Sequence, residues 1–148
     1  MKKVYLLIIA ICIAFSCQTK EEKEACEKPA ETTSKKKFEM YEMSEMSLLM
    51  EQMYVDNQRL KERINNGDTI GKFPTHFMEI HKAVMTDDSE NDAFFKEQAA
   101  KFIKAQQLIY EDPKNAKEHF NEGVNACLSC HEVKCGGPIP RIKKLYIE

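Results

Sequence analysis

The chain has 148 residues, and its 22 lysines and arginines oppose 24 aspartates and glutamates, for a formal net charge of −2 at pH 7. This length suits a single domain with one hydrophobic core. The opposite charges are interspersed, so no basic region creates the field that nucleic-acid binding requires. We therefore expect one folded domain and no nucleic-acid partner.

The N-terminus has the features of a bacterial secretion signal. Two lysines precede an unbroken apolar run, Val4–Phe15, which is too short to span a bilayer comfortably. Small residues at the third and first positions before Cys17 resemble the lipobox of bacterial lipoproteins. We expect residues 1–16 to be removed as a signal peptide and Cys17 to carry a lipid, which places a membrane-anchored lipoprotein in the periplasm or cell envelope. Cleavage at the same bond without lipidation is the alternative.

Residues 17–37 are rich in charge and contain no aromatic side chain. Because such a segment can bury too little apolar surface to fold, we expect a disordered tether with a reach of about 25 Å. The tether would hold the domain close to the membrane surface. Cys26 is the one residue of this segment whose role its composition does not explain.

The segment 38–66 predicts a long amphipathic helix, because its apolar side chains recur at steps of three and four. Only Asn57 interrupts the stripe, and Gly67 follows the segment at the position where a left-handed residue commonly ends a helix. The residues of the stripe are Met43, Met46, Met50, Met53, Leu60 and Ile64.

Three more segments have helical spacing. A short apolar face runs from Phe77 to Met85, a longer one covers Phe94–Tyr110, and a fourth follows Asp112-Pro113, a cap residue with proline at the first helical position. No segment alternates with period two, so we expect no strands. Short loops favour antiparallel neighbours, and we predict an all-α fold, with an antiparallel four-helix bundle over 38–135 and a C-terminal arm over 136–148.

Three cysteines and a histidine lie close together on the fourth predicted helix: Cys127, Cys130, His131 and Cys135. The first three form the C-x-x-C-H pattern of c-type haem attachment. Cysteines three apart on a helix project from the same side, so both thiols can bond one edge of a porphyrin. The adjoining histidine can then bind the iron as proximal ligand. We predict one haem c, joined through Cys127 and Cys130 and ligated by His131.

Two other chemistries fit the four residues less well. A Cys₃His zinc site would need a tetrahedral set in which His131 directly follows Cys130, which leaves little room for the usual loop. A redox-active dithiol needs a strand before a helix, and no strand is expected here. Both stay open as alternatives to haem.

With C-x-x-C-H near the C-terminus of a predicted bundle, residues 38–135 resemble the class II c-type cytochromes, the cytochrome c′ family. The resemblance implies a four-helix bundle in which a first-helix residue covers the distal face of the haem. In low-spin members a methionine ligates the iron there, and in high-spin members the position is open to small gases. Counting back from Gly67 places Met50 nearest the distal position, with Met46 as the next choice. Two histidines, His76 and His81, could compete for the same position, although a surface location suits them better.

The chain departs from that family after the haem motif. We expect the arm to fold back along the bundle and Arg141 or Lys143 to pair a haem propionate, because guanidinium matches carboxylate geometry. Cys135 and Cys26 are left over once two thiols hold haem, so in an oxidising compartment a disulfide between them is the simplest prediction. A disulfide between two copies of the chain, which would make a homodimer, and a free thiol are the alternatives.

No catalytic constellation accompanies the motif, so we expect an electron carrier and not an enzyme. Its partners would be redox proteins and, through Cys17, a membrane. The first alternative is a five-coordinate haem protein that binds gases such as NO or CO. The second is a haem-free helical module stapled by zinc or a disulfide.

Overall fold

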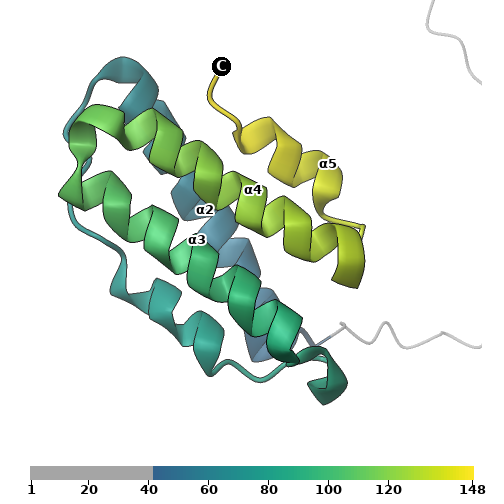
Figure 1. Ribbon diagram of the computed structural model, residues 1–148. Helices are drawn as coiled ribbons and strands as arrows, with labels where there is room; N and C mark the ends of the chain where they lie inside the picture. Colours follow the sequence, from purple (N-terminus) through teal and green to yellow (C-terminus); the bar gives the residue numbers. More distant parts are fainter. Residues whose placement is uncertain (1–41) are drawn as a thin grey trace, which may run out of the picture. The chain divides into compact units, whose positions relative to one another are not determined.

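The computed structural model describes residues 42–148 (Figure 1). The predicted signal peptide, the tether, and Cys17 and Cys26 within it lie outside the described residues. Inside them every regular element is helical, so the all-α prediction is confirmed for this part of the chain. The elements are α2 (Glu45–Asn66), η1 (Thr75–His81), η2 (Asp88–Glu90), α3 (Ala93–Glu111), η3 (Pro113–Asn115), α4 (Ala116–Lys134), α5 (Ile139–Ile142) and η4 (Lys143–Leu145), where η denotes a 3₁₀ helix.

Helix α2 begins and ends at local signals. The Ser44 hydroxyl accepts a hydrogen bond from the Ser47 amide at 3.2 Å, so the helix starts at Glu45 and not at residue 38 as predicted. The helix ends at Gly67, whose φ of 69° is left-handed, as predicted. The amides of Gly67 and Asp68 donate to the carbonyls of Ile64 and Arg63, which satisfies two otherwise free acceptors.

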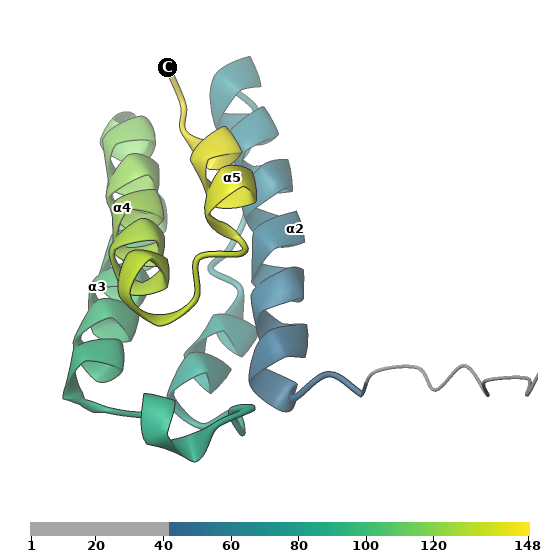
Figure 2. The ribbon, with the colours of Figure 1, turned by 90° about the vertical axis from the view of Figure 1, so that its right-hand side faces the viewer.

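The second predicted helix is instead the 3₁₀ helix η1. Pro74 precedes it, and its two buried side chains, Phe77 and Ile80, are three residues apart, which matches the three residues per turn of a 3₁₀ helix. Val84, which the prediction placed on the buried face, lies beyond the end of η1 and is 57% exposed. Figure 2 shows η1 between α2 and α3, where it closes one side of the core.

Helices α3 and α4 form the most extensive helix pair among the described residues. The Asp92 carboxylate caps α3 by accepting from the Phe95 amide at 2.8 Å. Gly123 on α4 permits the close approach, because a Cβ there would lie 3.3 Å from Nε2 of Gln106 on α3. That amide is fully buried and donates to Oδ1 of buried Asn57 on α2 at 2.8 Å, so the polar break in the methionine stripe joins α2 to α3.

The C-terminal arm folds back between α2 and α4, as expected (Figure 2). Its side chains Ile142, Leu145 and Ile147 are buried in a cluster with α2, α3 and α4. Lys61 on α2 donates to the carbonyls of Lys144 and Tyr146, at 2.9 and 2.5 Å. The side chains of the arm are therefore part of the hydrophobic core.

Candidate functional site

The C-x-x-C-H motif lies on the last two turns of α4, which the helical spacing predicted. Cys127 and Cys130 are half-buried free thiols that pack against the core from the same side of the helix. His131 is half-buried and follows on the neighbouring position. The two cysteines and the histidine are thus presented together at one end of the domain.

The ring of His131 is held at one nitrogen. Nδ1 lies 3.1 Å from the backbone carbonyl oxygen of Cys135 and 3.1 Å from its Sγ. A histidine that binds a metal through Nε2 usually donates its Nδ1–H to a carbonyl or carboxylate, which sets the tautomer and the ring orientation. The contact with Cys135 therefore suits His131 to act as an iron ligand through Nε2.

Two neighbouring hollows flank His131, one toward the arm and one toward the methionine stripe. The arm hollow contains about 510 Å³ and the methionine hollow about 1030 Å³ of space free of atoms, part of it open to solvent. Sites for small molecules and cofactors are concave and mainly apolar, as these two hollows are. Cys127 lines the arm hollow and Cys130 the methionine hollow. Four residues line both: Met50, Glu51, His131 and Pro138.

Of the candidate distal ligands, Met50 shares both hollows with His131. Met46 lines only the methionine hollow and is 8% exposed, and Met53 lines only the arm hollow and is 4% exposed. Met43 is 40% exposed at the start of the stripe. Met50 is thus the methionine placed nearest to what the distal prediction requires, and its ligation stays a prediction.

The pKa values of the three thiols disfavour dithiol chemistry. Burial, with a smaller effect of the neighbouring Cys130, raises the pKa of Cys127 to about 12. Burial also raises the pKa of Cys130 and of Cys135. A reactive dithiol depends on a lowered cysteine pKa, because the thiolate is the nucleophile. The described residues contain no group of three or more His, Cys, Asp or Glu side chains arranged to hold a metal ion.

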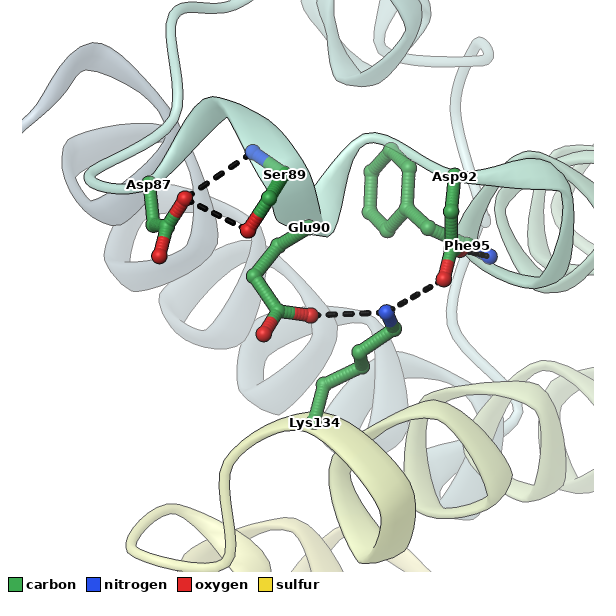
Figure 3. Close-up of polar contacts among 6 residues, drawn as sticks. All are labelled: Asp87, Ser89, Glu90, Asp92, Phe95 and Lys134. Atoms are coloured by element: carbon green, nitrogen blue, oxygen red, sulfur yellow. Dashed lines mark hydrogen bonds and ion pairs between the residues drawn. The ribbon is translucent and has the colours of Figure 1, made fainter.

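A salt-bridge cluster ties the end of α4 to the start of α3 (Figure 3). Lys134 Nζ lies 2.6 Å from Oδ2 of Asp92 and 2.7 Å from Oε2 of Glu90. The hydrogen bond to Asp92, and after it the bond to Glu90, raises the pKa of Lys134. The same bond lowers the pKa of Asp92. The cluster anchors the helical turn that carries His131. The sequence predicted neither partner, because the pair joins residues far apart in the chain.

Arg141 on α5 lines the arm hollow, but its planar fork is already paired. Nη1 and Nη2 donate to the two carboxylate oxygens of Glu51 at 2.7 and 2.9 Å, and the guanidinium lies 4.2 Å from the ring centroid of Tyr54. The Arg141 hydrogen bond lowers the pKa of Glu51. Lys143 is exposed and lines neither hollow. The contact of Arg141 or Lys143 with a propionate stays a prediction.

The remaining histidines lie away from both hollows. His76 Nε2 pairs with Asp56 at 3.0 Å, and His119 Nε2 pairs with Asp112 at 3.3 Å. His81 is exposed at the end of η1. Cys135 is an exposed free thiol among the described residues. Cys26 lies outside them, so the disulfide between Cys26 and Cys135 stays a prediction.

Comparisons with protein-family models, curated proteins and solved structures found no match to this chain. Within residues 42–148, each helix is too short or too polar to cross a membrane. The function therefore has to be inferred from the C-x-x-C-H motif and from the residues that surround it.

Proposed function

We propose that this chain is an exported, lipid-anchored monohaem c-type cytochrome that carries single electrons. The arrangement around the C-x-x-C-H motif carries the proposal. The motif lies at a half-buried helix end, His131 is held at Nδ1, and Met50 lines both hollows that His131 lines. Thiols, imidazole and apolar walls of this kind suit haem c, whereas they suit neither a reactive dithiol nor a tetrahedral zinc site.

Each residue of the site would have a defined task. Cys127 and Cys130 would hold haem c through thioether bonds, which also keeps the two thiols from oxidising in the periplasm. His131 would bind the iron through Nε2, while the Cys135 carbonyl keeps its ring oriented. Haem c, when bound, supplies one-electron redox chemistry at its iron. A Met50 thioether on the other side would close the coordination sphere and raise the reduction potential.

The surroundings of the motif also favour electron transfer. Apolar side chains of α2 and α3, Met53 and Phe102 among them, line the arm hollow and would exclude water from the cofactor. We infer kinship with the cytochrome c′ family, with α2, α3 and α4 as three helices of the bundle and η1 in the place of the fourth. The lipid on Cys17 would hold the carrier at a membrane of the cell envelope, within reach of redox partner proteins.

A five-coordinate haem protein that binds NO or CO is the second candidate. The openness of the methionine hollow toward solvent favours it, since a gas could enter there if no methionine binds the iron. The two candidates differ only at the distal position. A haem-free zinc or disulfide module, the third alternative, would show no haem spectrum.

The test is production of the full chain in a host that attaches haem c. We expect the peptide containing Cys127 and Cys130 to carry the mass of haem, and the reduced protein to show the sharp bands of low-spin haem c. The Cys127→Ala/Cys130→Ala double variant should contain no covalent haem, whereas the matched Cys135→Ala variant should retain it. A colourless protein with bare thiols or bound zinc after export would refute the proposal.

The distal position is tested separately. Met50→Ala should convert the spectrum from six-coordinate to five-coordinate and allow the ferrous protein to bind CO, while Met46→Ala should leave the spectrum unchanged. A wild-type protein that is already five-coordinate would favour the gas-binding candidate. A five-coordinate spectrum in Met46→Ala, but not in Met50→Ala, would identify Met46 as the iron ligand.

A further inference from the structure

The arm crosses from the motif to α2 at the level of the candidate site. After α4 ends at Lys134, the chain passes through Gly136 and Gly137, and Pro138 then lines both hollows. Three residues later Arg141 reaches α2, where its two terminal nitrogens pair with the carboxylate of Glu51. A short segment thus connects the helix that carries His131 to the helix that carries Met50.

Arg141 contacts α2 immediately after Met50 in the chain. Glu51 directly follows Met50, and Tyr54, whose ring Arg141 covers at 4.2 Å, lies one helical turn further along. Met50 and Glu51 both line both hollows. Residues of α2 and of α4 line both hollows, so a contact from the arm to α2 can help to define the distance between Met50 and His131.

We propose that Arg141 is a positioning residue, a latch that holds α2 against the arm through Glu51 and Tyr54 and so keeps Met50 opposite His131. This inference rests on the proposed function and on Met50 as the distal ligand. A bidentate guanidinium–carboxylate pair fixes direction as well as distance, which suits a latch better than a lysine would. This proposal assigns to Arg141 a task distinct from propionate binding, because both of its terminal nitrogens already donate to Glu51.

The strength of the latch follows from its exposure. The side chains of Arg141 and Glu51 are 47% and 49% exposed, so solvent weakens the charge pair. Stacking on Tyr54 adds a second contribution of similar size. Opening the latch should therefore release Met50 in a fraction of molecules, with a change in the bound-to-free ratio of roughly 5- to 30-fold.

The experiment measures CO binding to the ferrous haem protein, because CO competes with the distal methionine. Arg141→Ala should raise the CO affinity roughly 5- to 30-fold, and Glu51→Gln should raise it by a smaller factor of roughly 2- to 5-fold, since Tyr54 still holds Arg141. The double variant should match Arg141→Ala and not exceed it, because both changes open one latch. Met50→Ala gives the upper limit, and Arg141→Lys should restore part of the wild-type value.

The matched control is Lys101→Ala, which breaks an exposed ion pair with Glu97 within α3, 2.6 Å long, and should leave CO affinity unchanged. A change in Arg141→Ala without any change in Glu51→Gln would assign Arg141 to a propionate and overturn the latch. Both variants could also unfold at a lower denaturant concentration while their CO affinity stays unaltered. That result would show a purely structural role for Arg141 and would overturn the latch. A wild-type protein without haem would instead refute the proposed function.

Discussion

The burial of the penultimate residue, Ile147, gives a quantitative test of the C-terminal arm. Its side chain is 6% exposed and packs in the cluster that contains Leu60 and Phe120. Both polar groups of its backbone are paired with Asn121, the amide at 3.0 Å and the carbonyl at 2.9 Å. The burial of Ile147 and its paired backbone indicate that the arm stabilises the fold.

We expect Ile147→Ala to lower the free energy of unfolding by about 2–3 kcal/mol. The change removes three buried carbon atoms, each worth about 0.8 kcal/mol of transfer free energy, which gives about 2.4 kcal/mol before any cavity cost. This value lies at the low end of the range for such substitutions, because it includes no cavity cost. The corresponding decrease in Tm is about 10 °C.

The measurement is urea unfolding of the haem-attached protein, followed by far-UV circular dichroism. Lys143→Ala, an exposed change in the same arm, is the control and should alter the free energy of unfolding by less than about 0.5 kcal/mol. The dependence on urea should keep the same slope in all proteins. An Ile147→Ala protein as stable as the control would show that the arm does not belong to the core, and the reasoning about its packing would be wrong.

Two further predictions concern polar contacts away from the haem motif. Gln106→Leu should cost about 1–3 kcal/mol of stability, because buried Oδ1 of Asn57 loses the hydrogen bond that Gln106 donates. Adding Asn57→Leu should recover part of the loss, and a double variant less stable than the single one would contradict this. The hydrogen bond from Asn115, and after it the bond from His119, lowers the pKa of Asp112. This carboxylate therefore stabilises the fold at pH values above its ordinary pKa. The contribution disappears as the pH falls through the lowered pKa. The stability advantage of the wild type over Asp112→Asn should therefore shrink between about pH 5 and pH 2 in thermal unfolding, and an advantage that grows on acidification would contradict the assignment.

Several features could be predicted from the sequence because their signals are local. The recurrence of apolar residues at steps of three and four identified α2, α3 and α4, and the left-handed glycine at Gly67 marked the end of α2. The C-x-x-C-H spacing identified the candidate haem residues without any knowledge of the fold. The same reasoning failed for η1, since residues 77–85 carry an apolar face that fits a 3₁₀ turn as well as an α-helix.

Only the tertiary structure decided which distant segments meet. It placed Met50, the methionine that the count from Gly67 had favoured, in both hollows with His131, and it paired Arg141 with Glu51 and Lys134 with Asp92. These partners are separated by long stretches of chain, and periodicity along one helix carries no information about which side chain of another helix it will face. The composition of this protein and its local spacing determined its helices and its motif, whereas the packing of the arm between α2 and α4 determined the surroundings in which that motif would act.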